Sequence, residues 1–234
     1  MIEKNIIYYN ENCKPMNILA ISDIHDDIEG LQKLSENPIL EEIDVLMIAG
    51  DLCNENPEYV VPIVDNFSIN VIFIRGNHDP VRMGSFSNAI ELKYGQVMKF
   101  KDYSILGHPY PVFDPSCSRL DDDSMLYNHI QGHNQIDIVL SHAPPYGFFD
   151  YLGEDETFRI GSQSLFKFIH DKSPRLVICG HMHEFGGRYA KIKDTLVVNV
   201  APFNRFDPKG MGNPGMKITI EKSNISFDYF NINQ

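Results

Sequence analysis

The chain has 234 residues, of which 43% are hydrophobic and 22% are charged, and its formal net charge is −12. This suits a single domain over residues 1–234, in which residues 1–15 form an N-terminal extension. The acidic balance argues against a strong nucleic-acid-binding surface, because such surfaces need Lys and Arg to neutralise phosphates. No apolar run approaches the roughly 18 residues of a membrane helix and no secretory signal is evident, so we expect a cytoplasmic protein without membrane contact.

The cysteines do not form a disulfide framework. None of them makes a CxxC pair, and a domain of this size does not need covalent cross-links. They are Cys13, Cys53, Cys117 and Cys179. Cys53 lies two residues after an acidic position, but a packed thiol is a better interpretation than a ligand. The cysteine pattern therefore indicates a reducing compartment.

The first strand expected in the core covers residues 18–21, after a possible edge strand at 6–9. Asp23 and His25 follow it, two residues apart. On an extended backbone their side chains share a face, where a carboxylate and an imidazole form a chelating pair for a divalent metal. Taken alone, this pair fits a solvated strand end better.

Two further units repeat this arrangement of a strand followed by polar residues. The pair Asp26-Asp27 is a plausible cap for a helix, since Ile28, Leu31 and Leu34 then fall at helical spacing. Residues 45–49 form a buried strand that leads into Asp51. Pro57 opens a second helix, with Tyr59, Val60, Ile63 and Val64 expected on its apolar side.

The next strand, at 71–75, leads into Gly76-Asn77-His78-Asp79. An amide, an imidazole and a carboxylate thus follow one strand directly. The carboxyl ends of strands are where open α/β sheets bind ligands. The tetrapeptide alone is equally consistent with turn chemistry.

The middle of the chain is less regular. We expect a short strand at 104–106, and we interpret the acidic run at 121–123 as a solvated surface. His129 and His133 have a spacing that could bind metal on a helix. Gly132 between them is a poor helix former, so this site is disfavoured.

The last third repeats the pattern twice. A strand at 136–140 precedes His142, and a strand at 176–179 precedes His181 and His183, which would share a face on extended backbone. Between them, Ser162 is expected to cap a helix. A further strand at 196–198 and a hairpin formed by 216–221 and 225–230 complete the prediction. For the aromatic residues Phe148, Phe149 and Tyr151, packing is favoured over a ligand-binding wall.

Polar blocks with metal-ligand chemistry thus follow five apolar strands. They are D-x-H at 23–25, G-D at 50–51, G-N-H-D at 76–79, S-H at 141–142 and G-H-x-H at 180–183. Chance placement of all five at strand ends is far less probable than chance for any one, so the set indicates a functional site.

In these blocks and in their order, the sequence resembles the calcineurin-like metallophosphoesterase superfamily, from about Asn17 to Val200. The stretches that begin at His142 and at Gly180 are most similar to the small branch that includes the brain metallophosphoesterase-domain proteins. The resemblance implies an α/β fold, a four-layer αββα sandwich with two mixed β-sheets and the site on the strand-end loops.

The resemblance also implies two divalent metal ions and a role for each site residue. The first ion would be held by Asp23, His25, Asp51 and His183, and the second by Asp51, Asn77, His142 and His181. A metal-bridging hydroxide would attack phosphorus, with His78 protonating the leaving oxygen and Asp79 holding the ring of His78. Nitrogen and oxygen ligands suit Mn²⁺ first, with Fe or Zn²⁺ as alternatives.

The function implied first is a phosphodiesterase acting on a small phosphoester substrate such as a cyclic nucleotide. A phosphomonoesterase or protein phosphatase is the second hypothesis. It is disfavoured because protein phosphatases carry Asp-Arg-Gly after G-D and Glu in place of Asp79, whereas here Leu52 follows Asp51. A non-catalytic scaffold of the same fold is the third, and a nuclease is disfavoured by the acidic balance.

Overall fold

The computed structural model describes residues 14–109, 135–151, 159–222 and 224–232. No helix in these ranges is long and apolar enough to cross a membrane. Several sequence predictions lie outside the described residues: the edge strand at 6–9, the acidic run at 121–123, and the residues Cys13, Cys117, His129 and His133.

The first sheet has six strands in the order β12-β11-β1-β2-β3-β4. Strands β1 to β4 are parallel, and β11 and β12 are antiparallel additions, so the sheet is mixed. The strands are β1 (Met16–Ile21), β2 (Val45–Ala49), β3 (Asn70–Ile74), β4 (Ile90–Glu91), β11 (Pro214–Ile220) and β12 (Ile225–Asn231). The predicted C-terminal hairpin is confirmed as β11 and β12.

The second sheet also has six strands, in the order β5-β6-β7-β8-β10-β9. Its four central strands are parallel, and the edge strands β5 and β9 are antiparallel to their neighbours. The strands are β5 (Val97–Phe100), β6 (Tyr103–His108), β7 (Ile138–Ser141), β8 (Leu176–Cys179), β9 (Tyr189–Ile192) and β10 (Thr195–Asn199).

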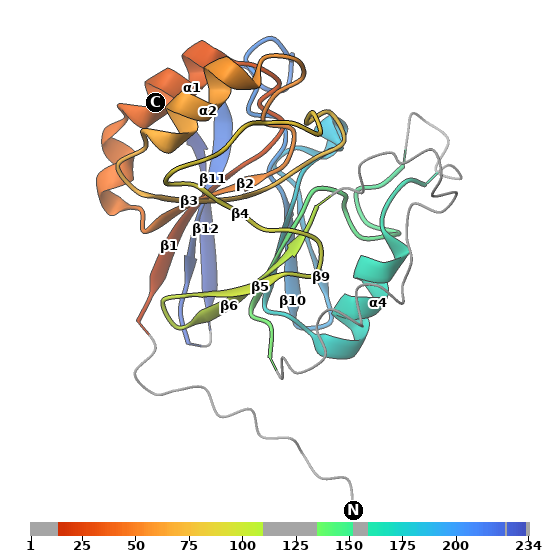
Figure 1. Ribbon diagram of the computed structural model, residues 1–234. Helices are drawn as coiled ribbons and strands as arrows, with labels where there is room; N and C mark the ends of the chain where they lie inside the picture. Colours follow the sequence, from red (N-terminus) through yellow and green to blue (C-terminus); the bar gives the residue numbers. More distant parts are fainter. Residues whose placement is uncertain (1–13, 110–134, 152–158, 223, 233–234) are drawn as a thin grey trace, which may run out of the picture.

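Helices cover the outer faces of both sheets (Figure 1). Helices α1 (Ile28–Ser35) and α2 (Pro57–Asp65) lie over the first sheet, and α4 (Gln163–Lys172) lies over the second. Short 3-10 helices occur at Pro38–Glu42 and at His183–Phe185, the latter labelled η2 here. The predicted four-layer αββα arrangement is therefore confirmed.

The predicted capping residues begin two of these helices. Asp27 caps α1 by accepting a hydrogen bond from the backbone N–H of Gly30, and Ser162 caps α4 by accepting one from Leu165. Such side-chain oxygens satisfy backbone donors that have no partner inside the helix. Both helix starts could therefore be read from the sequence.

The central hydrophobic core lies between the two sheets. It is formed by inward side chains such as Ile18 and Val45 from one sheet and Ile138 and Ile178 from the other. Separate clusters pack α1 and α2 on the first sheet and α4 on the second. One prediction about the apolar side of α2 is wrong. Tyr59 is 60% exposed, because Val60 and Val64 are the residues of this helix that face the sheet.

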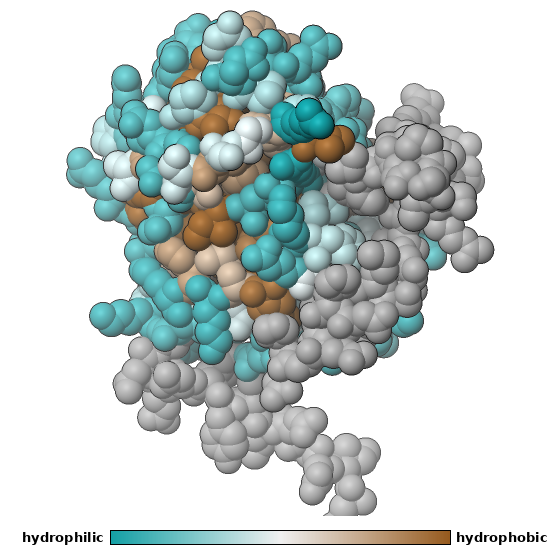
Figure 2. Space-filling view, in the orientation of Figure 1, coloured by the Kyte–Doolittle hydropathy of each residue, from teal (hydrophilic) through white to brown (hydrophobic). Residues whose placement is uncertain are grey.

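One face of the molecule carries an edge strand of each sheet. Most of this face is hydrophilic, and hydrophobic side chains gather in its middle (Figure 2), where the edge strands β4 and β5 lie (Figure 1). Ile90 of β4 is 41% exposed, and Met98 and Phe100 of β5 are partly buried against the central core.

Parallel pairing brings the polar blocks together. The parallel strands of each sheet end close to one another, so the loops after β1, β2 and β3 lie at one edge of the first sheet, and those after β7 and β8 lie at one edge of the second sheet. The Nδ1 atom of His142, after β7, lies 2.7 Å from the carbonyl oxygen of Ala49 at the end of β2. This contact joins the two sheets at the site.

Candidate metal centre

Backbone hydrogen bonds connect the polar loops before any side chain is considered. The N–H of Asp23 donates to the carbonyl of Gly50 at 3.0 Å, and the N–H of His25 donates to that of Asp51 at 3.1 Å. Across the site, the N–H of His181 donates to Oδ2 of Asp23 at 2.9 Å. Hydrogen bonds therefore hold these loops to one another.

Four candidate ligands sit on left-handed backbone. The φ angles are +56° at Asp23, +47° at His25, +53° at Asp51 and +66° at His181. Residues other than glycine rarely adopt this region, and such outliers concentrate at functional sites. The sequence argument that Asp23 and His25, or His181 and His183, share a face on extended backbone is therefore wrong. The loops bring these residues together by a different route.

The glycines of the polar blocks are needed for close approach. A Cβ atom on Gly76 would collide with the carboxylate of Asp51, and one on Gly180 would collide with Ser22 and with the carboxylate of Asp23. Both carboxylates thus pack directly against a neighbouring main chain, which fixes their position.

A first group of ligand atoms surrounds Asp23. Its Oδ1 atom lies 3.2 Å from Nε2 of His183 and 3.7 Å from Nε2 of His25. The three side chains can offer ligand atoms that all lie within 4.8 Å of one another. Nε2 of His25 is also 3.7 Å from Oδ2 of Asp51. The structure thus brings together the residues expected at the first metal.

A second group lies on the other side of Asp51. Oδ2 of Asp51 is 3.4 Å from Nε2 of His142, which is in turn 3.0 Å from Oδ1 of Asn77. The rings of His142 and His181 have centroids 5.0 Å apart. Asp51 therefore lies between the two groups, as expected of a bridging ligand, although Asp23 also lies within 4.8 Å of the Asp51–His142 pair. His181 and His183 face different groups.

Three of the imidazoles are held by their Nδ1 atoms so that Nε2 points inward. The partners of Nδ1 are the Asn54 side-chain oxygen for His25 at 2.8 Å, the Ala49 carbonyl for His142 at 2.7 Å and the Asp207 carboxylate for His183 at 2.8 Å. A histidine ligand commonly donates its second N–H to such an oxygen, which selects the tautomer that leaves the other nitrogen for metal.

Two buried carboxylates set the electrostatics of the site. Asp23 and Asp51 are 0% and 1% exposed. Burial alone would raise their pKa values, but the hydrogen bonds and charges of neighbouring histidines hold both pKa values below the ordinary range. Carboxylate pairs in low dielectric demand compensating positive charge. Divalent cations would supply it, so the donor set fits the two ions that the resemblance implies.

The surroundings shift the pKa values of the site histidines in opposite directions. Burial lowers the pKa of His142, but the charge of Asp51 outweighs this and raises it to about 9. For His183, burial is outweighed by its hydrogen bond to Asp23 and by Asp207, and the pKa is raised to about 9. Burial and the neighbouring His142 lower the pKa of His181 to about 4. His181 is thus a neutral imidazole at pH 7, the form that binds metal.

His78 and Asp79 are placed differently from one another. The ring of His78 is exposed and packs edge-on against His25, with centroids 5.1 Å apart, while its backbone N–H donates to Asp51 at 2.8 Å. The two oxygens of Asp79 accept backbone hydrogen bonds from Gly76 at 2.8 Å and Cys53 at 3.0 Å. Asp79 therefore holds the loop, and the expected contact with the His78 ring is replaced by these backbone contacts.

Other candidates are structural. Cys53 is buried, and burial together with Asp79 raises the pKa of its thiol to about 12, so it is no thiolate ligand at neutral pH. Phe148 and Phe149 pack against the outer core of the second sheet, and the ring of Tyr151 lies edge-on to Phe185, with centroids 4.8 Å apart. The packing contacts expected of these aromatic residues are present.

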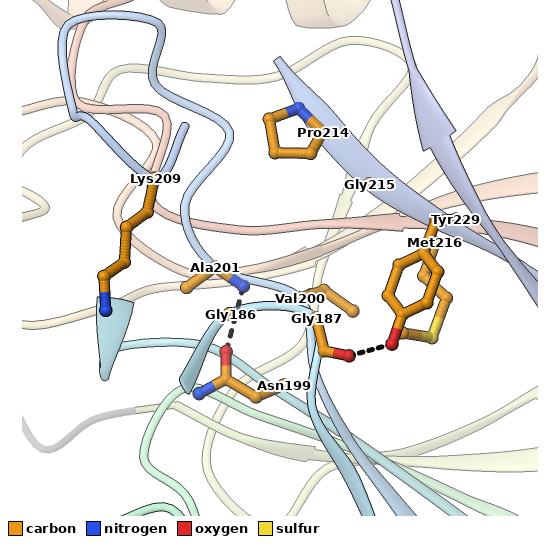
Figure 3. A pocket seen from close by; sticks show the side chains of 10 residues that line it. All are labelled: Gly186, Gly187, Asn199, Val200, Ala201, Lys209, Pro214, Gly215, Met216 and Tyr229. Carbon is orange, nitrogen blue, oxygen red and sulfur yellow. Dashed lines mark hydrogen bonds between the residues drawn. The ribbon is translucent and has the colours of Figure 1, made fainter. Parts of the chain in front are cut away.

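Sequence reasoning missed three residues that support the site, namely Asn54, Asn199 and Asp207. Asn199 is fully buried, donates to the carbonyl of Met182 at 3.0 Å and accepts from the N–H of Ala201. Together with Gly186 and Gly187 it lines a cavity of about 360 Å³ (Figure 3), and its side-chain amide holds the main chain at Met182 and Ala201. Only the position of Asn54 close after Asp51 offered a signal in the sequence.

Comparisons with known proteins agree with this arrangement. The model of the calcineurin-like phosphoesterase family matches residues 16–185. No curated protein sequence matches the chain significantly. Among solved structures, the Thermus thermophilus protein TT1561 is 14% identical, with 94% of this chain and 100% of that one covered and a TM-score of 0.68.

Two further structures share the fold at low identity. An archaeal phosphodiesterase is 15% identical over 92% of this chain and 100% of its own, with a TM-score of 0.52. GAP50, the anchor in the inner membrane complex of Plasmodium, is 11% identical over 94% of this chain and 85% of its own, with a TM-score of 0.61. Because the family match spans more than half of the chain, this protein belongs to the calcineurin-like phosphoesterase family.

Proposed function

We propose that this chain is a dinuclear-metal phosphoesterase that hydrolyses phosphodiester bonds in cyclic nucleotides or other small diesters. One observation carries the proposal. Three histidines, each anchored through Nδ1, turn Nε2 toward the same two buried carboxylates, with separations of 3.2–3.7 Å. A packed core has no need of such an arrangement, whereas a pair of cations does.

The residues divide into two ligand sets that share Asp51. Asp23, His25 and His183 would complete the first set, and Asn77, His142 and His181 the second. Divalent ions in such sites supply Lewis acidity, which polarises phosphoryl oxygens and makes water a competent nucleophile near neutral pH. The family match supports divalent metal binding, and Mn²⁺ is proposed as the ion.

The remaining residues act on the substrate and on the loop. His78 presents an exposed ring at the rim of the first ligand set, where it is placed to give a proton to the leaving oxygen. Its main chain is fixed through the hydrogen bond to Asp51, so the ring keeps its place relative to the ligands. Asp79 holds the loop of His78 in place by accepting hydrogen bonds from the backbone N–H groups of Gly76 and Cys53.

A phosphomonoesterase and a scaffold are the alternatives. The scaffold is favoured by one finding, since the anchor protein GAP50 has the same fold. Against it, all seven proposed ligand positions and His78 are kept in this chain and are brought to one place. Against the protein-phosphatase class, Gly50-Asp51 is followed by Leu52 instead of the start of an Asp-Arg-Gly stretch, and Asp79 stands where that class has Glu.

The test is a turnover panel on protein reconstituted with Mn²⁺. It compares an aryl phosphodiester, the matching monoester, and 2′,3′- and 3′,5′-cyclic nucleotides, with the Asp51→Asn variant as the background control. We expect at least one diester to be hydrolysed faster than the monoester. A faster monoester would make the chain a monoesterase, and no turnover of any substrate above background would favour the scaffold.

Metal binding should release protons, and its affinity should rise with pH. The pKa values of about 9 mean that His142 and His183 each hold a proton at pH 7 when no metal is bound. Metal requires neutral imidazoles, so both protons must leave. Titration calorimetry with Mn²⁺ in two buffers of different ionisation enthalpy should show net proton release at pH 7, which falls as the pH rises through about 9. Identical heats in both buffers would contradict this.

A further inference from the structure

The loop between β10 and β11 brings a carboxylate to the rear of the candidate metal centre. Oδ2 of Asp207 lies 2.8 Å from Nδ1 of His183, whose Nε2 lies 3.2 Å from Oδ1 of Asp23. His183 thus stands between an inner and an outer carboxylate. Asp207 belongs to none of the polar blocks and follows His183 by 24 residues.

His183 needs such a partner more than the other inward-facing histidines do. The side chain of His142 is 0% exposed and is anchored by the main chain of β2, whereas that of His183 is 27% exposed and lies at the start of η2, a single 3-10 turn. A partly exposed ring on so short an element has rotational freedom, and a second contact, at Nδ1, restricts it.

Asp207 is itself fixed. Its other oxygen accepts the N–H of Lys209 at 2.8 Å, and its own N–H donates to the carbonyl of Asn204 at 3.0 Å. The ends of the loop are tied to buried Asp27, whose Oδ2 accepts from the N–H of Arg205 at 3.0 Å and from Nδ2 of Asn213 at 2.7 Å. The loop therefore presents a carboxylate whose position is determined before His183 meets it.

We infer that Asp207 is a positioning residue, which holds the His183 imidazole with Nε2 directed at the first ligand set. The inference rests on the proposed metal site and extends it to a residue that touches no ligand position except His183. Asp207 would orient the imidazole ring of His183 and would make its Nε2 atom a stronger electron-pair donor to the metal. Its loss would thus weaken one of two metal-binding events and leave the other.

The experiment measures Mn²⁺ binding by titration calorimetry for wild type, Asp207→Ala and Asp207→Asn. The matched control is Asp171→Ala, which removes a carboxylate 3.3 Å from Nδ1 of His170 on the surface of α4. We expect Asp207→Ala to weaken one binding event by about 10–100-fold. Asp207→Asn should recover most of this loss, because its amide oxygen can still accept from Nδ1–H. Asp171→Ala should bind as wild type does.

The outcomes separate this inference from the proposed function. If wild type binds no Mn²⁺, the metal site itself fails. If wild type binds two ions and Asp207→Ala binds them equally well, only the positioning role is overturned. Equal losses of Mn²⁺ affinity in the Ala and Asn variants would also overturn it. So would a melting temperature of metal-free Asp207→Ala low enough for the protein to be partly unfolded during the titration, because unfolding would then explain the weaker binding.

Discussion

Asp51→Asn should abolish turnover and release both metal ions. The carboxylate of Asp51 lies 3.4 Å from His142 on one side and 3.7 Å from His25 on the other, so one residue serves both ligand sets. The substitution keeps the shape of the side chain and removes its charge, which is the property that two adjacent cations require. We expect kcat/KM to fall by more than about 10³-fold, beyond the loss of one electrostatic group.

Elemental analysis of the reconstituted variant gives the direct measurement. Asp65→Asn is the matched control, since this half-buried carboxylate also accepts backbone hydrogen bonds, from Ser87 and Asn88, but stands outside the site. It should retain two ions and full activity. An Asp51→Asn protein that kept both ions would show that Asp51 does not bridge the two sites.

His78→Ala should separate metal binding from catalysis. The His78 ring is exposed and packs edge-on against His25, but its only hydrogen bond to a proposed ligand is made by its backbone N–H, so removal of the ring should leave both ligand sets in place. Loss of a positioned acid costs about 10²–10⁴ in rate. The fall in kcat should be largest for an alkoxide leaving group such as a ribose oxygen, and smallest for a nitrophenolate, which departs without a proton.

The control for this variant is His170→Ala, which removes a surface imidazole from α4. It should have wild-type kcat with every leaving group. An equal loss for alkoxide and nitrophenolate substrates would mean that His78 stabilises the phosphoryl oxygens instead of acting as an acid. Loss of a metal ion from His78→Ala would make His78 a ligand and would change the assignment of both sets.

The strands and the polar blocks after them were predictable because both are local. An apolar run such as Val45–Ala49 must be buried, and the residue that follows it at a sheet edge must lie in a loop. Parallel pairing then gathers these loops without any further information. This is why Asp23 and Asp51 converge as expected, whereas His142 reaches them from the second sheet through the packing of one sheet on the other.

The supporting residues were not predictable because tertiary contacts place them. Asp207 reaches His183 through a loop that is tied to the cap of α1, a contact that spans 178 residues between Asp27 and Arg205. The partners of Asp79 were misjudged for a similar reason. Proximity in sequence favoured the neighbouring ring of His78, whereas the fold presents the backbone N–H of Cys53, which is 26 residues away.

The left-handed backbone at Asp23, His25, Asp51 and His181 bears on how this chain can evolve. Each such residue costs about 1–3 kcal/mol relative to one that adopts the conformation freely. Glycine at any of the four positions would relieve that strain, so drift without selection for chemistry would tend to erase these side chains in favour of stability. A lineage that retains all four is one in which loss of the site has been the costlier change. In a relative with only a structural role, selection would no longer oppose the substitution of glycine at these positions.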